Sequence, residues 1–173
     1  CAHMWEVIRS EETVIDLACG PATQLGMLAR LNPNTRFIGV DLSEEMLQRA
    51  KHYIKELALE NVELRSGDIT ALHDFEEDCA DVVVSTMSLH HLPTLEHLDA
   101  AFSEARRLLK AGGGLYLADF GHLRSERSIR YFAYQHEERQ PELFTVDYLN
   151  SLLAAFQLED FRNMKQKHFN SDA

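Results

Sequence analysis

The sequence predicts an α/β fold in which helices flank a doubly wound, mostly parallel sheet. Short apolar runs alternate with amphipathic stretches through most of the chain. One of these runs, 81–85, is rich in valine, as expected for a strand that is buried on both faces of a parallel sheet. The length of 173 residues and the hydrophobic content of 45% fit one globular domain with a substantial core.

The first half of the chain predicts three strands, at 14–17, 36–40 and 62–65, with a helix between each pair. The first helix, 23–31, closes at Asn32-Pro33-Asn34. Ser43 is suited to cap the second helix. Its expected buried face consists of residues at helical spacing: Met46, Ala50, Ile54 and Leu57.

The second half predicts a strand at 81–85, a helix at 94–109 and a strand at 115–118. The apolar side of that helix consists of Leu98, Ala101, Ala105 and Leu108. We expect the three glycines 112–114 to end the helix. Beyond Asp119 the pattern loosens: 124–138 is a charged, aromatic stretch broken by Pro141, 146–156 is an amphipathic helix, and 158–161 is expected to be a strand.

Charge and composition exclude several classes of function. The formal net charge of -11 argues against DNA or RNA as a partner. No apolar run is long enough to cross a bilayer, so no membrane partner is expected. The three cysteines form no C-x-x-C pair, which indicates a reduced, cytoplasmic protein without a disulfide framework. We interpret residues 1–4 as an expression scar.

The turn 18–22 is the most informative segment. It joins an apolar strand to a helix, an arrangement that brings bare backbone and a helix N-terminus to a ligand. Asp41 ends the next strand about twenty residues later, where an acid accepts hydrogen bonds from ribose hydroxyls in nucleotide-binding α/β folds. An adenosine-like ligand is therefore expected. A nicotinamide dehydrogenase is disfavoured because 18–23 lacks G-x-G-x-x-G.

Five motifs then resemble, in order, those of the class I S-adenosylmethionine-dependent methyltransferases of small-molecule type. The segments are Asp16-Leu17-Ala18-Cys19-Gly20, Gly39-Val40-Asp41-Leu42-Ser43, Ser66-Gly67-Asp68-Ile69, the strand 81–85 followed by Leu89-His90-His91-Leu92, and 108–113. The resemblance implies a Rossmann-like fold and S-adenosylmethionine as cofactor. It divides a single domain, 5–173, into a motif core, 14–119, and a substrate-side and C-terminal segment, 120–173.

The resemblance also assigns roles to residues. Asp41, with Leu42 beside it, would hold the ribose, and Gly67, Asp68 and Ile69 would bind the adenine. Asp16 would help to hold the methionine amino group, with the backbone of Ala18, Gly20 and Ser85 lining the same end. Each acid also has a structural interpretation: Asp41 as a surface acid, Asp68 as a turn residue, and Asp16 as a brace for the turn.

His90 is the candidate general base, because an imidazole titrates near neutral pH, and its alternative is a structural role. A metal site at His90, His91 and His97 is not expected, since no carboxylate or cysteine lies at ligand spacing. A further group occupies the region where members of this family form the substrate pocket, and one of its arginines would clamp an anionic acceptor: Arg124, Arg127, Arg130, Tyr131, Tyr134 and His136. Their alternative is a solvated helix.

The expected activity is methyl transfer to a nitrogen or oxygen atom of a small molecule. The stretch 85–88 reads Ser-Thr-Met-Ser, not the Asn-Pro-Pro-Tyr type of enzymes that methylate nucleic-acid base amines. A cofactor-binding domain without transferase activity and transfer of a carboxymethyl group stay open, as do acceptor identity and oligomeric state. Three features depart from the family: Ala18 and Ala22 replace common glycines, Pro21 removes a backbone donor, and both terminal segments are expected to be incomplete.

Overall fold

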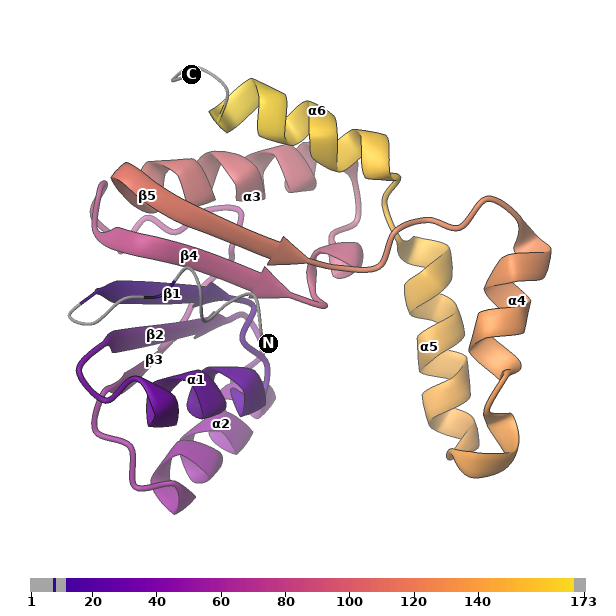
Figure 1. The fold of residues 1–173 in the computed structure, drawn as a ribbon, viewed down its shortest axis with the longest axis horizontal. Coiled ribbons are helices and arrows are strands. Elements are labelled where there is room, and N and C mark those ends of the chain that lie inside the picture. Colours follow the sequence, from indigo (N-terminus) through magenta and orange to yellow (C-terminus); the bar gives the residue numbers. More distant parts are fainter. Residues whose placement is uncertain (1–7, 9–11, 170–173) are drawn as a thin grey trace. The chain divides into compact units, whose positions relative to one another are not determined.

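The sheet has five strands in the order β3-β2-β1-β4-β5 (Figure 1). This computed structural model describes residue 8 and residues 12–169, so the interpretation of residues 1–4 as a scar concerns a segment outside the described residues. The strands are β1 (Thr13–Leu17), β2 (Arg36–Asp41), β3 (Val62–Ser66), β4 (Ala80–Thr86) and β5 (Leu109–Ala118). β1 pairs in parallel with both β2 and β4, and β2 pairs in parallel with β3. The doubly wound sheet is confirmed.

Helices cover the sheet as its connections require. α1 (Thr23–Leu31) contacts β2, and α2 (Glu44–Glu56) contacts β2 and β3. α3 (Leu95–Leu108) connects β4 to β5, and this step runs toward the opposite edge of the sheet from the steps β1 to β2 and β2 to β3. A right-handed crossover therefore places α3 on the opposite face of the sheet from α1 and α2. α2 begins as predicted, because the Ser43 side chain accepts a hydrogen bond from the backbone N–H of Met46.

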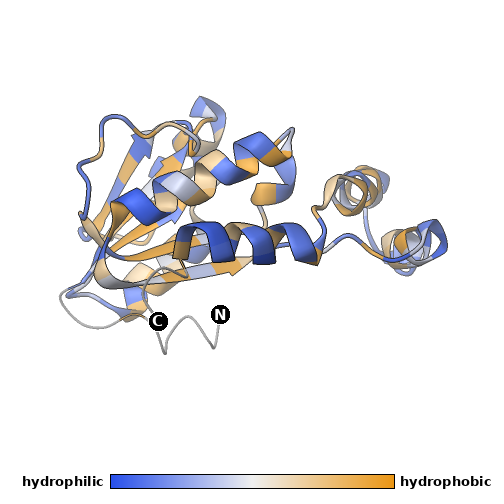
Figure 2. Cartoon of the chain, turned by 90° about the horizontal axis from the view of Figure 1, so that it is seen from above, coloured by the Kyte–Doolittle hydropathy of each residue, from blue (hydrophilic) through white to orange (hydrophobic). Residues whose placement is uncertain are grey.

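The core lies between the strands and these helices. The three valines Val82–Val84 are at most 2% exposed, which confirms a strand buried on both faces. In Figure 2 the helices that cover the sheet carry both hydrophilic and hydrophobic colour, as amphipathic helices do. The predicted apolar side of α3 is confirmed in full, with every member buried: Leu98, Ala101, Ala105 and Leu108. On α2, Leu47 is buried with Ala50 and Ile54, whereas Met46 and Leu57 are only half-buried.

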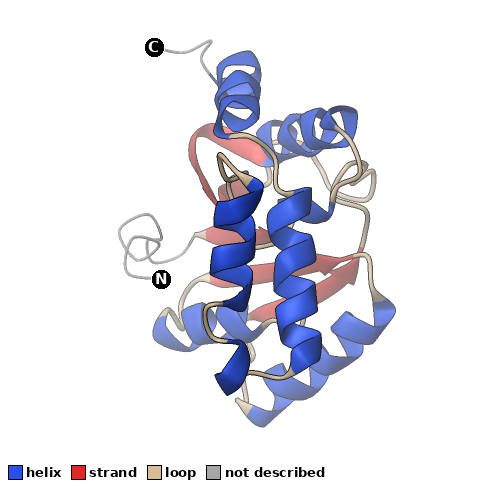
Figure 3. Cartoon of the chain, turned by 90° about the vertical axis from the view of Figure 1, so that its right-hand side faces the viewer, coloured by secondary structure: helices blue, strands red, loops and turns tan. Residues whose placement is uncertain are grey.

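The chain divides into two compact units. The first holds the sheet, and it contains the chain up to Thr86 together with Asp99–Leu117. The second contains Met87–Leu98 and the chain from Ala118 onward, with short 3₁₀ turns η2 (Leu89–His91) and η3 (Glu137–Arg139) and helices α4 (Glu126–Tyr134), α5 (Glu142–Ala154) and α6 (Leu158–Phe169). α4 and α5 lie side by side (Figure 3) and enclose a small apolar cluster of Ile129, Ala133 and Leu152. Within the described part of the chain, every helix is too short or too polar to cross a bilayer.

The strand predicted at 158–161 is wrong, because this segment begins α6. The Asp160 carboxylate accepts a hydrogen bond from the backbone N–H of Gln157 at 2.8 Å, the reciprocal half of a capping box. Acidic residues occupy the first turn of α6, and Lys167 and His168 occupy its last turn, which suits the helix dipole. These terminal charges are visible in the sequence, and they favour a helix over the strand that was predicted from the short run 158–161.

The glycines 112–114 do not end α3 but lie inside β5, which begins at Leu109. Gly112 has φ +76°, so it bends the strand through a conformation that favours glycine. A Cβ on Gly113 would lie 3.0 Å from the carbonyl oxygen of Asp81, so the close approach of β5 to β4 requires a glycine there. The expected strand at 115–118 is thus the second part of a longer one.

Candidate functional site

The candidate site of the first unit lies at the carboxyl ends of the strands. β1 and β4 are neighbours, yet their following helices lie on opposite faces, which is the switch point where open α/β sheets bind ligands. The structure brings most of the predicted cofactor residues to this edge. Asp16 lies near the end of β1, the turn 18–22 follows it, Asp41 ends β2, and Ser85 lies near the end of β4.

The turn after β1 has three residues with left-handed backbone: Ala18 (φ 58°), Gly20 (φ 55°) and Ala22 (φ 57°). Cys19 fixes the turn to β2, since its N–H donates to the carbonyl oxygen of Val40 at 2.9 Å. This geometry explains why the family that the sequence resembles commonly has glycine at the positions of Ala18 and Ala22. A Cβ at positive φ is strained, and glycine avoids that strain.

Ala18→Gly should therefore raise the free energy of unfolding by about 0.5–1 kcal/mol, because relief of strain outweighs the larger entropy of the unfolded chain. Ala58→Gly is the matched control, since Ala58 has φ 50° just beyond the end of α2 and is remote from the turn. Urea unfolding of both variants measures the effect. Destabilisation by Ala18→Gly together with stabilisation by Ala58→Gly would show that the Ala18 methyl group contributes packing that exceeds its strain.

The Asp41 carboxylate connects the loops around the site. Its Oδ2 accepts from the N–H of Gly20 at 2.7 Å and its Oδ1 accepts from the N–H of Ser43 at 2.8 Å. Its backbone oxygen accepts from the N–H of Gly67 at 3.1 Å. Asp41 is 9% exposed, so it is not the surface acid of the alternative interpretation. The Gly20 N–H, which was expected to face a cofactor, instead donates its hydrogen bond to Asp41.

Asp16 is buried, 4% exposed, and its side chain makes no hydrogen bond to another described residue. Burial, and then the nearby charge of Asp41, raise the pKa of Asp16 from 3.8 to about 7. No described side-chain oxygen or nitrogen is both sealed from solvent and without a partner, so the Asp16 carboxyl reaches accessible space. A buried carboxyl of this kind is suited to receive a cationic ligand group.

Close packing supports the turn from beneath. A Cβ built on Gly39 of β2 would lie 2.7 Å from Cδ2 of Leu25, 2.8 Å from Sγ of Cys19 and 2.9 Å from Cδ2 of Leu64. Gly39 is therefore needed for the turn and α1 to approach the sheet. Burial, with the charges of Asp16 and Asp41 adding to it, raises the pKa of the Cys19 thiol well above its usual range. Cys19 is a packing residue rather than a nucleophile.

The expected adenine residues lie after β3 and β2. Asp68 is exposed, and its Oδ1 accepts from both the N–H and the Oγ1 of Thr70, at 2.9 and 2.7 Å. This is the turn interaction of the structural interpretation, and it leaves the proposed adenine role a prediction. Ile69 is buried, whereas Leu42 is 70% exposed beside Asp41. An exposed leucine at a strand end is suited to cover a flat apolar ligand.

Two contacts at the end of β4 hold the site together. The Ser85 hydroxyl is buried and donates to the carbonyl oxygen of Leu17 at 2.9 Å, which ties β4 to β1. Thr86 and Gln24 join β4 to α1 through a hydrogen bond of 2.6 Å. The sequence reading named Ser85 for its small size and missed Gln24, because nothing in the local pattern predicts this pairing.

In the second unit, His90 pairs with an acid that sequence reasoning did not select. His90 Nδ1 lies 2.6 Å from Oδ1 of Asp119, and both side chains are 3% exposed. Oδ2 of Asp119 also accepts from the N–H groups of Ser88 and Leu89, at 3.0 and 2.6 Å. Burial opposes ionisation, yet the bonds from His90 and the backbone hold the pKa of Asp119 below its usual value. Asp119 follows β5 directly, and an acid at a strand end is the signal that could have found it.

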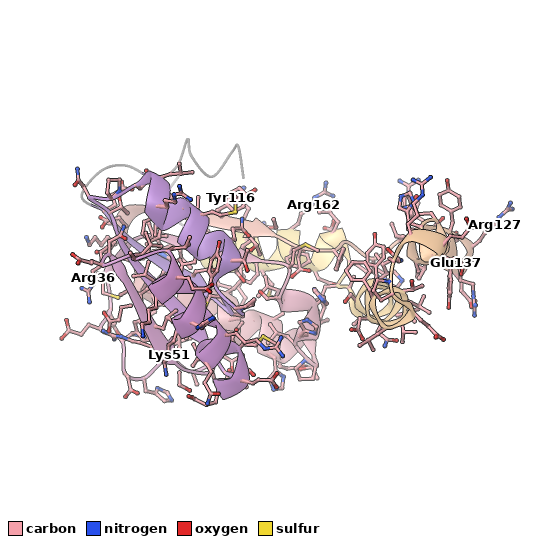
Figure 4. All side chains as sticks on the ribbon, turned by 90° about the horizontal axis from the view of Figure 1, so that it is seen from below. Arg36, Lys51, Tyr116, Arg127, Glu137 and Arg162 are labelled. Atoms are coloured by element: carbon pink, nitrogen blue, oxygen red, sulfur yellow. The ribbon has the colours of Figure 1, made fainter. Side chains whose placement is uncertain are left out.

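Most of the other polar side chains that the sequence singled out lie apart from this pair. His97 is exposed and bonded to Thr94, and burial followed by His90 lowers the pKa of His91. Among the described residues, no cluster of three or more acids, histidines and cysteines could hold a metal ion. The arginines of the aromatic stretch are exposed, and Figure 4 shows Arg127 extending from α4 into solvent. Arg127 and Arg130 lie on a solvated face of α4, and Arg124 lies in the exposed segment before that helix.

Comparison with known proteins identifies the family. A family model described as a methyltransferase domain matches residues 8–147. The chain belongs to the class I S-adenosylmethionine-dependent methyltransferases. In this methyltransferase chain, the left-handed turn, the Asp41 carboxylate and the uncapped N-terminus of α1 lie at the same end of the sheet, and Asp41 is bonded to the turn through the N–H of Gly20.

Relatives share part of their length with this methyltransferase chain. An uncharacterized 37.1 kDa protein of transposon Tn4556 from Streptomyces fradiae is 38% identical over 112 residues, which are 64% of this chain and 31% of that protein. A demethylmenaquinone methyltransferase from Lactococcus lactis is 34% identical over 111 residues, which are 64% of this chain and 42% of that protein. The YcgJ protein of Bacillus subtilis shares the fold, with a TM-score of 0.73 at 21% identity over 96% of this chain and 65% of its own. The chain thus spans less than half of these two curated relatives.

Proposed function

We propose that this chain transfers a methyl group from S-adenosylmethionine to a nitrogen or oxygen atom of a small molecule. The observation that carries the proposal is the pair of buried carboxyls, Asp16 and Asp41, at the ends of adjacent strands beside the left-handed turn. A cation and a ribose are the two groups that such a pair is suited to bind together. Both belong to S-adenosylmethionine.

The residues present fit the cofactor. Each Asp41 oxygen accepts one backbone hydrogen bond and retains lone pairs for the ribose hydroxyls. Asp16 would receive the methionine amino group, while Leu42, Asp68 and Ile69 would surround the adenine. No side chain caps α1 and no acid lies in its first turn, so its N-terminus suits the methionine carboxylate. When bound, the sulfonium of the cofactor supplies an electrophilic methyl group.

His90 would serve an oxygen acceptor as general base. Its Nδ1–H donates to Asp119 in the tautomer that we assign, which leaves the lone pair on Nε2. Nε2 would take the proton of an acceptor hydroxyl and so prepare its oxygen to receive the methyl group, and the Asp119 carboxylate would stabilise the imidazolium that forms. A neutral amine needs the same alignment without the base.

The proposal treats 5–173 as one methyltransferase domain, in which 14–119 binds the cofactor and 120–173 contributes to acceptor binding. A small-molecule acceptor is supported by the net charge of -11, which opposes a nucleic-acid acceptor. The name of one relative, a demethylmenaquinone methyltransferase, points to an acceptor of small-molecule size.

Calorimetric titration with S-adenosylmethionine, S-adenosylhomocysteine and NAD tests the cofactor. Micromolar binding of both sulfur ligands without binding of NAD is the expected result. Binding of NAD alone would overturn the proposal. Methyl transfer is then measured with radiolabelled cofactor and a panel of phenols, alcohols and amines. Tight binding without turnover across the panel would favour a non-catalytic binding domain.

Asp41→Ala should weaken binding of S-adenosylmethionine by about 1–3 kcal/mol, because the ribose loses a charged acceptor. The same change should lower the melting temperature of the free protein, since the N–H groups of Gly20 and Ser43 lose their partner. Asp68→Ala is the contrast: its exposed carboxylate should affect binding with little loss of stability. Unchanged cofactor affinity in Asp41→Ala would remove Asp41 from the site.

A further inference from the structure

The second unit contains a pocket of about 740 Å³ whose residues all belong to that unit. Its volume lies in the range of sites for small molecules. The η2 turn and the residues after it form one wall, and α5 with the residues after it forms the other. The lining consists of His90, His91, Leu92, Pro93, Asp147, Asn150, Ser151, Ala154 and Phe156.

The α5 wall is a polar stripe. Asp147, Asn150 and Ser151 recur at the spacing of one helix face. None of these three side chains makes a hydrogen bond or ion pair with another described residue. A carboxylate, an amide and a hydroxyl are therefore available to a ligand, and Phe156 adds an aromatic surface.

The carboxylates around the pocket are not balanced by lysine or arginine in its lining. Asp147 lies in the lining and Asp119 lies behind His90. Burial, followed by the neighbouring His90, lowers the pKa of His91, which favours its uncharged form. The pocket therefore opposes anions and favours neutral or cationic molecules.

Two imidazoles line the pocket, and we take His90 as the base because it is bonded to Asp119. Nδ1 is bonded to Asp119, and Nε2 has no hydrogen-bond partner among the described residues. Every described side-chain nitrogen that is sealed from solvent has a partner, so Nε2 reaches accessible space. Because His90 lines the pocket, Nε2 is available to a molecule bound there.

We infer that this pocket binds the methyl acceptor, and that the acceptor is an alcohol, phenol or amine without anionic groups, whose cationic or hydrogen-bond-donating substituent is recognised by Asp147. The inference rests on the proposed function, and it assigns recognition to a carboxylate, whereas the sequence hypothesis of an arginine clamp applied to an anionic acceptor. Asp119 acts as a positioning residue, since it fixes the tautomer and orientation of His90.

Three phenols of similar size and different charge test the inference: tyramine (cationic), 4-ethylphenol (neutral) and 4-hydroxyphenylacetate (anionic). Binding to the full chain is followed by NMR, with S-adenosylhomocysteine present, through the His90 ring and Asn150 side-chain resonances. Tyramine and 4-ethylphenol should shift both sets, and the anion should bind at least about tenfold more weakly than tyramine. Equal or tighter binding of the anion, or no shift with any phenol, would overturn the inference.

Asp147→Asn should remove the preference for tyramine over 4-ethylphenol, whereas Glu142→Gln should keep it. Glu142 is exposed on the same helix, makes no ion pair with a described residue and lies outside the lining, so the two variants change charge alike. An unchanged preference in Asp147→Asn would refute the role of Asp147. Calorimetry with S-adenosylmethionine tests the proposed function separately. If the cofactor does not bind, the relative affinities of the three phenols can still be measured, and if the phenols do not bind, the cofactor affinity can still be measured.

Discussion

Asp16→Asn should make the protein more stable at pH 8, by up to about 4 kcal/mol in the free energy of unfolding without cofactor. The pKa of Asp16 is raised from 3.8 to about 7 in the folded protein, first by burial and then by Asp41. Between these two values the folded chain holds a proton that the unfolded chain releases. This stabilisation is complete below about pH 4 and is lost as the pH rises through about 7. Asparagine stays neutral and does not lose it.

Urea unfolding of both proteins from pH 5 to pH 8 measures this effect. The advantage of Asp16→Asn over the natural chain should grow from pH 5 to about pH 7 and then level off toward pH 8, because only the natural carboxyl must ionise in a buried place. Asp81→Asn is the control: although burial opposes ionisation, the bonds from Lys110 and the N–H of Thr13 hold the pKa of Asp81 below 3.8. Asp81 is therefore ionised in the folded and the unfolded chain throughout this range, and the difference should be nearly constant with pH. A constant difference for Asp16→Asn would mean that the Asp16 carboxyl ionises at its ordinary pKa.

His90→Ala should lower kcat for an oxygen acceptor by about 10²–10⁴-fold, because general-base catalysis contributes that range, and should leave the affinity for S-adenosylmethionine unchanged. Asp119→Asn should lower kcat and stability together, because an amide has one acceptor oxygen for a site with several backbone donors.

His97→Ala is the matched control for that experiment. His97 is an exposed histidine near the start of α3, bonded to Thr94 and outside the pocket lining. It should keep kcat. If His90→Ala retains the natural rate, His90 is a structural residue and the acceptor does not need a base.

The sequence predicted the sheet and the first-unit site because each depends on local pattern. A strand that is buried on both faces reads as a continuous apolar run, and an acid that ends a parallel strand is visible without a structure. Asp16 and Asp41 were found in this way. Asp119 follows the same rule, since the predicted strand 115–118 ends directly before it, but its pairing with His90 joins positions 29 residues apart and is not visible in the local pattern.

The pocket of the second unit was beyond a local reading. Its two walls come from η2 and α5, which are far apart in the chain and meet only through tertiary packing. The polar stripe of α5 resembles any solvated helix face until its neighbour is known. The prediction of a strand at 158–161 failed for a different reason. Four residues of mixed character suit a strand or a helix, and only the charges at the two ends of α6 favour the helix.

The crowding around Gly39 has a consequence for how such chains diverge. A larger residue at position 39 would collide with Cys19, Leu25 and Leu64 at once, from the turn, α1 and β3. Homologous chains should therefore change these four positions in a correlated manner, with a side chain at 39 tolerated only where its neighbours have become smaller. The combined volume of these four side chains should therefore vary less among homologous chains than the identity of any one of them.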